Sequence, residues 1–342
     1  MRTGLISVIM GVHNEPEDYI RAALNSIFNQ TYKNIEIIII DDASDPICKS
    51  TIEDLCKDKS NVKVIHNDFN IGLTKSLNKG LDIASGEFVA RMDADDISLP
   101  DRFIKQINFL EKNPDIDIVG TGVVSFGEET KFMSPSNGYD NDEAQCNLFF
   151  SSTLCHPSVM IRKKFLEAHN LRYDENVKKG QDYDMWERCS VYGKLAVIKE
   201  VLLYYRTHSK QITSTNRADQ NLSAKNIHLR RLGRIGISPS EKEYRCHELL
   251  ASGVDKNIST NEVEQWVNKV LLYNERSGLV APKALLRNLK LRFILFKFRN
   301  RKHLGVKDFF PLCRILVSRA EMRIMLKRKR NEIYKTLSTG LL

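Results

Sequence analysis

The sequence predicts an α/β protein with a mostly parallel central sheet flanked by helices on both faces, followed by a helical and basic C-terminal region. Strand-like apolar runs alternate with segments of helical periodicity over the first 120 residues, which is typical of this class. The run Ile35–Ile40 (IEIIII) is apolar on both faces, as in a parallel strand that helices cover on two sides. After about residue 218 the composition is helical throughout, with breaks at Pro239, Gly253 and Pro282.

The elements of the first 120 residues follow one another in strict alternation. The expected strands are Leu5–Val12, Ile35–Ile40, Val62–Ile65, Glu87–Met92 and Ile116–Phe126. The expected helices are Pro16–Gln30, Ile47–Lys57, Gly72–Ala84 and Pro100–Lys112. Residues 127–150 are polar and predict a surface excursion, and strand and helix signals resume from Leu154 to about Arg206.

The change of composition near residue 215 predicts two parts. Residues 1–215 are expected to form an α/β domain with two halves (about 1–120 and about 121–215), and residues 216–342 the helical region. Hydrophobic residues make up 42% of the chain and charged residues 28%, which is typical of a globular protein and excludes a disordered one. The seven cysteines include no CxxC pair and predict free thiols in a reducing compartment. No apolar run approaches the ~20 residues of a membrane-spanning helix.

The net charge of +9 is unevenly distributed. Residues 283–335 contain 17 Lys and Arg but only three Asp and Glu, so the rest of the chain is mildly acidic. Basic residues alternate there with Leu and Phe, a pattern that fits an anionic membrane surface. The alternative is a helical cap with a solvated basic face. The pattern lacks the signature of a nucleic-acid-binding module, and no nucleic acid is expected as partner.

Polar tetrads follow three of the expected strands. They are HNEP after Val12, DDAS after Ile40 and DADD after Met92. Ligands of open α/β sheets bind outside the carboxyl ends of the strands, so these tetrads mark the expected site. Three carboxylates within Asp93–Asp96 repel one another, and a hard divalent cation such as Mn²⁺ or Mg²⁺ removes the repulsion. An acidic turn that caps the following helix is the alternative reading.

Together these motifs resemble the family 2 glycosyltransferases of the GT-A fold. The resemblance lies in SVIMGVHNEP, SIFNQTY, IEIIIIDDASD, NIGLTKSLNKGL and GEFVARMDADDISLPDRF, in this order and spacing. It covers residues 5–120 densely and extends in patches to about 213. It implies an enzyme that binds a nucleoside-diphosphate sugar, UDP being the expected nucleotide. Residues 1–215 would then be the GT-A catalytic domain, with the nucleotide-sugar half at about 1–120 and the acceptor half at about 121–215.

The resemblance also implies roles for single residues. Nucleotide-sugar contacts fall on Gly11, His13, Glu15, Asp42, Lys75, Arg91 and Asp93. Asp42 is expected to accept a hydrogen bond from uracil. Ligands of the Mn²⁺ or Mg²⁺ ion fall on Asp93, Asp95 and His208. Lys75 and Arg91 are alternatively surface or packing residues, and Arg102 is expected to be structural.

On the acceptor side, the segment GQDYDMW resembles the family segment that carries the general base. The role falls on Asp182, whose alternative is to cap a helix. Gln181 stands where glutamate is usual, which leaves the acceptor contacts open. His156, in CHPS, is a candidate contact of sugar or acceptor.

The implied function is inverting transfer of a hexose or N-acetylhexosamine from a UDP-sugar to an acceptor hydroxyl. The implied acceptor is an undecaprenyl-diphosphate-linked oligosaccharide of bacterial surface polysaccharide synthesis, at the inner face of the cytoplasmic membrane. A soluble or protein acceptor is the alternative, and nucleic-acid binding through the basic region is a rival class. A dinucleotide-dependent oxidoreductase is disfavoured, because GVHNEP stands where a GxGxxG turn would be expected.

Overall fold

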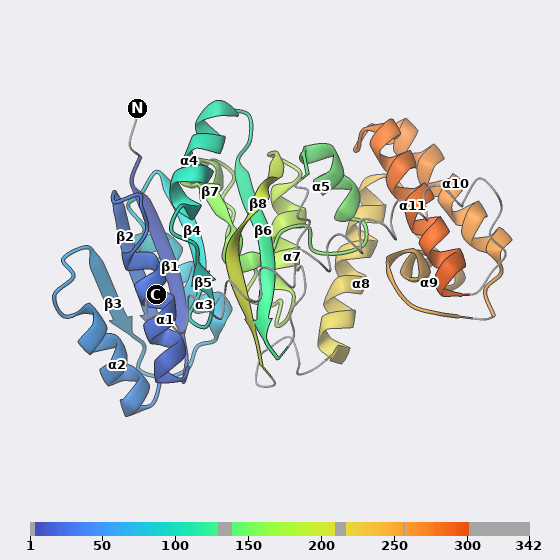
Figure 1. Ribbon diagram of the computed structural model, residues 1–342. Coiled ribbons are helices and arrows are strands. Elements are labelled where there is room, and N and C mark those ends of the chain that lie inside the picture. The colour runs from blue at the N-terminus through green and yellow to red at the C-terminus, as the bar shows by residue number, and fades with distance from the viewer. Residues whose placement is uncertain (1–3, 129–138, 209–216, 256, 301–342) are drawn as a thin grey trace.

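The computed structural model describes residues 4–128, 139–208, 217–255 and 257–300 (Figure 1). Its centre is a sheet whose described strands lie side by side in the order β3-β2-β1-β4-β7-β6-β8-β5. The strands are β1 (Ile6–Val12), β2 (Ile35–Asp41), β3 (Val62–His66), β4 (Phe88–Asp93), β5 (Ile97–Ser98), β6 (Ile118–Gly127), β7 (Met160–Arg162) and β8 (Leu195–Thr207).

Six of these strands point in one direction. β1 is parallel to β2 and β4, β2 is parallel to β3, and β6 is parallel to β8. β7 runs antiparallel to both β4 and β6, and the short β5 is antiparallel to β8. The predicted mostly parallel sheet is therefore confirmed, and the reversed strand β7 joins its N-terminal and C-terminal halves.

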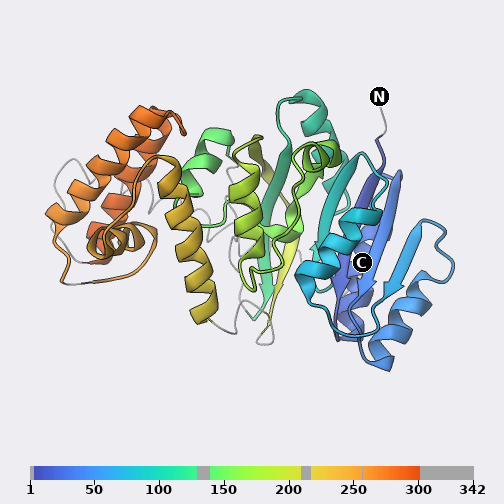
Figure 2. The same cartoon turned by 180° about the vertical axis from the view of Figure 1, so that it is seen from behind.

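Helices cover both faces of the sheet (Figures 1 and 2). One layer contains α1 (Glu17–Phe28), α2 (Pro46–Cys56) and α4 (Arg102–Lys112), and the other contains α3 (Leu73–Ile83), α6 (Lys163–Ala168) and α7 (Gln181–Cys189). Alternate residues of β2 enter the two layers, Ile37 and Ile39 the first and Ile38 and Ile40 the second. This double burial explains why IEIIII carries so little polar character.

One prediction for the middle of the chain is wrong. Residues 139–150, the larger described part of the expected surface excursion 127–150, include helix α5 (Asn141–Asn147) and a buried segment. Cys146, Phe149 and Phe150 pack into the core of the C-terminal helices. The polar residues that suggested a loop begin α5, where the carboxylate of Asp140 accepts a hydrogen bond from the Glu143 N–H at 3.0 Å.

The C-terminal helices gather at the opposite end of the molecule from β3 (Figure 1). They are α8 (Arg217–Arg234), α9 (Glu241–Ala251), α10 (Thr260–Ser277) and α11 (Pro282–Arg299). Capping boxes begin α9 and α10, where Ser240 pairs with Glu243 and Ser259 with Glu262. Trp266, Leu285 and Leu289 are buried in a core separate from the two sheet cores. On this basis we propose that the described residues 217–300 belong to a distinct helical region; the remainder of the predicted region 216–342 lies outside the described residues.

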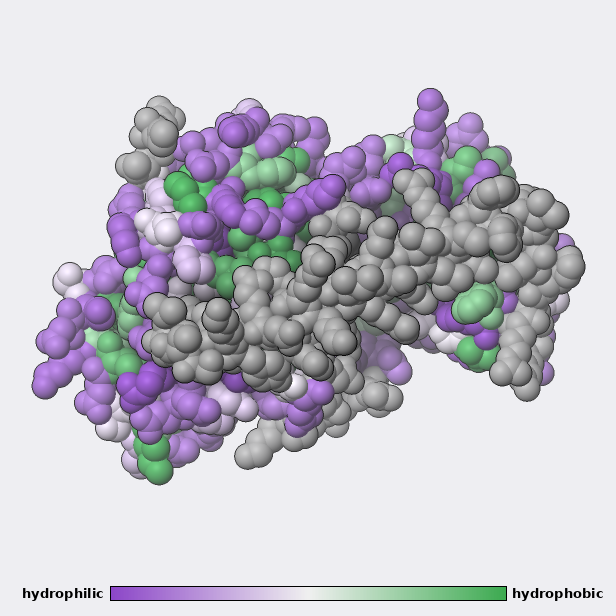
Figure 3. Space-filling model, in the orientation of Figure 1, coloured by the Kyte–Doolittle hydropathy of each residue, from purple (hydrophilic) through white to green (hydrophobic). Residues whose placement is uncertain are grey.

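The described surface is mainly hydrophilic. On the face shown in Figure 3, hydrophobic side chains form several patches between polar ones. Of the basic segment 283–335, only residues 283–300 are described, and residues 301–335 lie outside the described part. Leu285, Leu289 and Phe296 of α11 pack into the helical core, so these apolar side chains do not face outward. No described helix is long and apolar enough to cross a membrane.

Candidate active site

The ends of β1, β2 and β4 form the floor of a large cleft. In the strand register, Val12 lies opposite Asp41 and Gly11 lies opposite Asp93, so the three polar tetrads meet at one edge of the sheet. The cleft has a volume of about 1190 Å³. Every site residue predicted from the sequence lines it: Gly11, His13, Glu15, Asp42, Lys75, Arg91, Asp93, Asp95, His156, Gln181, Asp182 and His208.

The turns that follow β1 and β2 lock together. Asn14 donates its backbone N–H to Ser44 Oγ at 3.1 Å, and its side-chain Oδ1 accepts from the Asp45 N–H at 2.7 Å. Asn14 and Ala43 both have positive φ angles, 55° and 56°. Such angles cost energy for residues with a Cβ atom and persist where the surroundings impose them. The locked turns hold His13 in place, and its Nδ1 lies 2.8 Å from the carbonyl oxygen of Asp42.

Asp42 is engaged by the loop before α3. Its carboxylate accepts the backbone N–H groups of Ile71 and Gly72 and the side-chain amide of Asn67, each at 2.8 Å. The residue is only 4% exposed. A carboxylate offers about four acceptor positions, so three are taken by the protein itself. Asp42 therefore shapes the wall of the cleft, where Asn70 and Ile71 also lie.

An acidic cluster follows β4. One carboxylate oxygen from each of Asp93, Asp95 and Asp96 lies within 4.8 Å of the others, and among the described residues these three form the group that could hold a metal ion. Oxygen ligands at this density suit Mn²⁺ or Mg²⁺. The sequence indicated the cluster, but the resemblance assigned metal binding to Asp93 and Asp95 and left Asp96 out.

Asp96 is the most buried member of the cluster, with no exposed surface. One of its oxygens accepts the Arg206 N–H at 2.8 Å, and the other has no hydrogen-bond partner among the described residues. Burial, with the charges of Asp95 and Asp93, raises the pKa of Asp96 well above its usual value. An unsatisfied buried carboxylate is costly, and a cation or a proton relieves that cost. The residues therefore fit a divalent cation.

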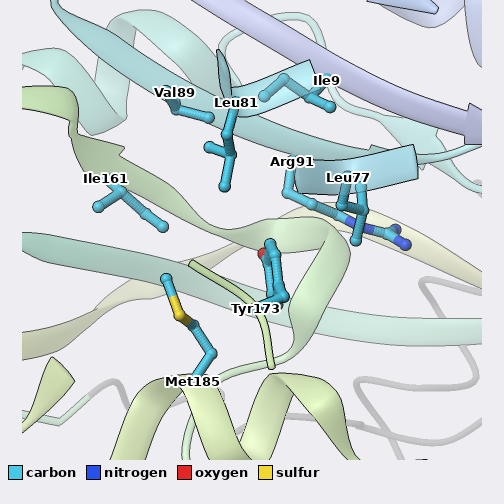
Figure 4. A pocket seen from close by; sticks show the side chains of 8 residues that line it. All are labelled: Ile9, Leu77, Leu81, Val89, Arg91, Ile161, Tyr173 and Met185. Carbon is cyan, nitrogen blue, oxygen red and sulfur yellow. The ribbon is translucent and has the colours of Figure 1, made fainter. Parts of the chain in front are cut away.

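Arg91 contributes a buried positive charge. It lies on β4, is 4% exposed and forms an ion pair with Asp93. Figure 4 shows its side chain beside Leu77 and Tyr173, with which it lines a small apolar void of about 10 Å³. Burial raises the pKa of Asp93 although Arg91 opposes the shift. Arg91 thus partly neutralises the negative charge of the acidic cluster from the buried side of the cleft floor.

His208 lies beside the same cluster. Its Nε2 is 3.1 Å from Oδ2 of Asp95, and its ring lies 5.6 Å from that of Tyr19. The neighbouring Arg206 donates from Nε to the Asp95 carbonyl at 2.7 Å and stacks on Tyr19 and Phe126. Residues at the end of β8, far from the acidic cluster in sequence, therefore form hydrogen bonds that hold the cluster in place.

Glu15 faces the acidic cluster from the turn after β1. Burial raises its pKa to about 7, and the negative charges of Asp95 and Asp93 add to the effect. A bound cation would restore the ionised form. Gly11 lies in β1 against Leu73, whose Cδ1 would be 3.0 Å from an added Cβ. Lys75 is exposed in the first turn of α3 and lines the cleft.

Asp182 lies on the opposite wall, in the first turn of α7. Its Oδ2 accepts a hydrogen bond from Ser152 Oγ at 3.2 Å. Burial raises its pKa, which is the direction expected for a carboxylate that takes up a proton near neutral pH. Gln181 begins the helix beside it, after Gly180, whose φ of 72° is a left-handed value that glycine adopts without strain.

His156 lines the cleft but is held by the protein. Its Nε2 lies 2.8 Å from the hydroxyl oxygen of Tyr173, and its ring packs edge-on against Trp186. Burial lowers its pKa well below the usual value, so the ring is neutral. Arg102, expected to be structural, is fully buried and donates to the Arg91 carbonyl oxygen at 2.9 Å.

A buried ionic cluster fixes α7 to α8, and the sequence gave no signal for it. Asp184 and Glu187 are almost completely buried on α7. Arg230 donates to Asp184 at 2.8 Å and to Glu187 at 2.5 Å, and Arg234 donates to Glu187 at 2.5 Å. The partners lie about 45 residues apart in sequence, so no local pattern could reveal them. They connect the helix that carries Asp182 to α8.

Comparison with known proteins gives the family. A model of "Glycosyl transferase family 2" matches residues 7–169. An uncharacterised glycosyltransferase of Haemophilus influenzae is 36% identical over 234 residues, which cover 65% of this chain and 72% of that protein. The chain belongs to glycosyltransferase family 2.

Two further relatives have assigned pathways. The O-antigen biosynthesis glycosyltransferase WbnJ of Escherichia coli is 32% identical over 60% of this chain and 81% of that protein. The amylovoran biosynthesis glycosyltransferase AmsE of Erwinia amylovora is 28% identical over 61% of this chain and 78% of that protein. The family resemblance read from the motifs is thus confirmed.

The fold also agrees with solved structures. Staphylococcus aureus TarS in complex with UDP-GlcNAc superimposes with a TM-score of 0.58 at 18% identity, over 88% of this chain and 93% of that chain. A TarS complex with UDP gives a TM-score of 0.56. The GT-A fold expected for this glycosyltransferase is therefore confirmed.

Proposed function

We propose that this glycosyltransferase transfers a hexose or N-acetylhexosamine from a UDP-sugar to an acceptor hydroxyl, with inversion at the anomeric carbon. The observation that carries the proposal is the single cleft that unites the acidic cluster on one wall with Asp182 on the other. TarS, which shares the fold, has been crystallised with UDP and with UDP-GlcNAc. This supports a uridine nucleotide as the donor carrier.

Asp182 is proposed as the general base. The acceptor oxygen forms a bond to the anomeric carbon while the bond from that carbon to the diphosphate oxygen breaks. The electron pair leaves with the nucleoside diphosphate, and the hydroxyl proton passes to Asp182. General-base help of this kind typically contributes ~10²–10⁴-fold. One base opposite one leaving group gives inversion, so an α-linked donor yields a β-linked product.

Asp93, Asp95 and Asp96 are proposed to hold Mn²⁺ or Mg²⁺, with His208 as a further ligand or as the group that orients Asp95. When bound, the ion neutralises charge that develops on the leaving diphosphate. Glu15, His13 and Gly11 are proposed to lie along the nucleotide. Asp42 is proposed to act through the Ile71–Gly72 loop, with its remaining acceptor position open to uracil.

The donor is tested with a panel of UDP-, GDP- and dTDP-sugars in the presence of Mn²⁺. We expect slow hydrolysis of one or a few UDP-sugars without acceptor, and tight binding of UDP. Preferred hydrolysis of a GDP- or dTDP-sugar would contradict the uridine assignment. Absence of turnover with every donor, together with absent UDP binding, would contradict the proposal as a whole.

The acceptor is proposed to be an undecaprenyl-diphosphate-linked oligosaccharide of a surface polysaccharide. Support comes from WbnJ and AmsE, whose names place them in O-antigen and amylovoran synthesis. Such an acceptor places the enzyme at the inner face of the cytoplasmic membrane. The basic residues of 283–335 are proposed to contact the anionic membrane surface.

Membrane association is tested by sedimentation with vesicles. We expect the full chain to pellet with anionic vesicles at low salt and not with neutral ones, because electrostatic attraction is screened as salt rises. A variant with Lys327, Arg328, Lys329 and Arg330 changed to Gln is expected to remain largely in the supernatant. Equal sedimentation with neutral vesicles would rule out the electrostatic mechanism.

A further inference from the structure

Two adjacent lysines line the acceptor side of the cleft. Lys178 and Lys179 immediately precede Gly180 and the helix that carries Asp182. Both lie on the cleft wall, Lys178 exposed and Lys179 partly buried. Neither has an acidic partner among the described residues. They differ in this from Arg91, a cation on the donor side of the cleft, which is paired with Asp93.

The segment that carries these lysines is anchored. The side chain of Asn78 on α3 accepts the Tyr173 N–H at 3.0 Å and donates to the Tyr173 carbonyl at 2.9 Å. It also donates to the Glu175 carboxylate at 3.3 Å. Asp174 then closes a turn by accepting the Asn176 N–H at 2.9 Å. The lysines are therefore presented from a fixed loop.

Helix stability does not account for the pair. Cations are favoured at the C-terminal end of a helix and disfavoured at its N-terminal end, where the backbone dipole is positive. Lys178 and Lys179 stand just before the first turn of α7 and face this unfavourable field. Two unpaired cations beside the proposed base are thus better explained by the ligand than by the fold.

We propose that Lys178 and Lys179 form an anion subsite for the acceptor, which carries a phosphate or diphosphate group next to the sugar that is glycosylated. The inference rests on the proposed function, because Asp182 must be the base for this wall to be the acceptor side. Three residue steps span at most about 11 Å, so Lys179 and Asp182 lie within the reach of one sugar and its phosphate. The donor diphosphate is assigned to the opposite, acidic wall.

The subsite is tested by binding of decyl diphosphate to the full chain in the presence of saturating UDP and Mn²⁺, which occupy the donor side. We expect the double variant Lys178→Ala/Lys179→Ala to weaken binding at least tenfold at low salt, and rising salt to reduce the difference. The matched control, Lys49→Ala on α2 with Lys57→Ala directly after it, removes two exposed lysines that do not line the cleft and is expected to leave binding within twofold.

Two comparison ligands identify the chemistry. Decyl glucoside carries no charge, and its binding is expected to be unaffected by the double variant. Inorganic diphosphate has no alkyl chain. If it binds as tightly as decyl diphosphate, the diphosphate group alone is recognised, as in a free sugar phosphate. If it binds more weakly, the lipid chain contributes to binding. The proposal is overturned if the double variant binds decyl diphosphate within twofold of wild type, or loses decyl glucoside equally.

Donor hydrolysis separates this inference from the proposed function. We expect the rate of UDP-sugar hydrolysis without acceptor to be the same in wild type and Lys178→Ala/Lys179→Ala. A matching fall in hydrolysis would assign the lysines to the donor and overturn the subsite. If no donor is hydrolysed and UDP does not bind, but decyl diphosphate binding still depends on the lysines, an anion site stands and the proposed function fails.

Discussion

Glu187 on α7 accepts a hydrogen bond from Arg234 on α8, with 2.5 Å between Oε1 and Nε. The carboxylate is completely buried, whereas the arginine retains 29% side-chain exposure. Together with Arg230 and Asp184, this pair fixes the helix that carries Asp182 to the C-terminal helical region. The cleft wall that carries the proposed base is thus attached to a helix that lies outside the sheet.

Neutralising Glu187 is expected to weaken the attachment of α7, the helix that carries Asp182, to α8. In Glu187→Gln, Arg230 and Arg234 lose a buried charged partner, and removing one member of a buried ion pair costs about 3–5 kcal/mol. Because both arginines are partly exposed, we expect the lower end of this range and a fall in kcat larger than the change in donor affinity. Denaturant unfolding and steady-state kinetics measure the two effects.

The control for this variant is Glu167→Gln. Glu167 forms an ion pair with Lys163 at 3.1 Å, but its side chain is 53% exposed. Exposed pairs contribute at most about 1 kcal/mol, so this change is expected to be nearly neutral. Equal destabilisation in the two variants would show that burial of the α7–α8 cluster is not what stabilises the fold.

Replacing the proposed base is expected to stop transfer while donor binding remains. Asp182→Asn keeps the size of the side chain but cannot take up the proton, and a loss of ~10²–10⁴-fold in kcat is expected. The raised pKa of Asp182 predicts that wild-type activity falls with acidification at a pH above 3.8, the ordinary value. Asp219→Asn, an exposed position on α8, is expected to leave rate and pH profile unchanged.

A divalent ion is expected to stabilise the protein through the acidic cluster. Binding to the folded state alone adds about 2.7 kcal/mol at a hundredfold excess over Kd. Asp95→Ala is expected to lose this gain and transfer activity. Without metal, the variant should be at least as stable as wild type, because Asp95 repels Glu15, Asp93 and Asp96.

Thermal unfolding with Mn²⁺ and with a chelator measures the effect. Asp58→Ala, an exposed position at the end of α2, is the control and should respond to Mn²⁺ like wild type. If the Asp95→Ala variant gained as much stability from Mn²⁺ as wild type, the ion would bind elsewhere.

Two buried histidines are expected to make the helical region sensitive to acid. Burial lowers the pKa of His228 to about 4 and that of His247 to about 3, and their rings lie 5.2 Å apart. In the unfolded chain both pKa values are near 6.5, so below that pH the unfolded state binds more protons. Stability is therefore lost as the pH falls from 6.5 toward 4, by about 2 kcal/mol per histidine at pH 5.

Unfolding by denaturant at pH 7.5 and pH 5.0 measures this loss. His247→Gln is expected to remove about half of the pH-dependent difference, whatever its effect on stability at pH 7.5. His169→Gln, at an exposed position, is expected to leave the difference unchanged. An unaltered difference in the His247→Gln protein would mean that other groups cause the acid sensitivity.

The sequence predicts the N-terminal half of the fold because its signals are local. Each strand from Ile6 to Asp93 and each helix between them has a clear apolar period, and their ends agree with the structure within about two residues. Strand β5 has only two residues and β7 only three, too few to show any period. Helix α5 was taken for a loop because its buried residues pack against distant parts of the chain, Ala144 in a sheet core with Leu195 and Cys146 in the core of the C-terminal helices.

The site was predicted in part, because some of its signals are also local in the sequence. The polar ends of parallel strands must meet at one edge, so the DADD and HNEP segments were expected to lie together, and they do. The engagement of Asp42 by Ile71 and Gly72, and the unsatisfied oxygen of Asp96, depend on three-dimensional packing. The residue types in the sequence therefore indicated neither the contacts of Asp42 nor the unpaired oxygen of Asp96.

The packing of Cys146, Phe149 and Phe150 among the C-terminal helices has an evolutionary consequence. Recombination at residue 215 would separate those helices from the end of α5 and the short stretch after it, which pack against them. A hybrid that joins the two halves from different parents would leave Cys146 and the two bulky side chains of Phe149 and Phe150 facing a mismatched partner. Diversification of the C-terminal end is therefore tied to changes inside the catalytic half.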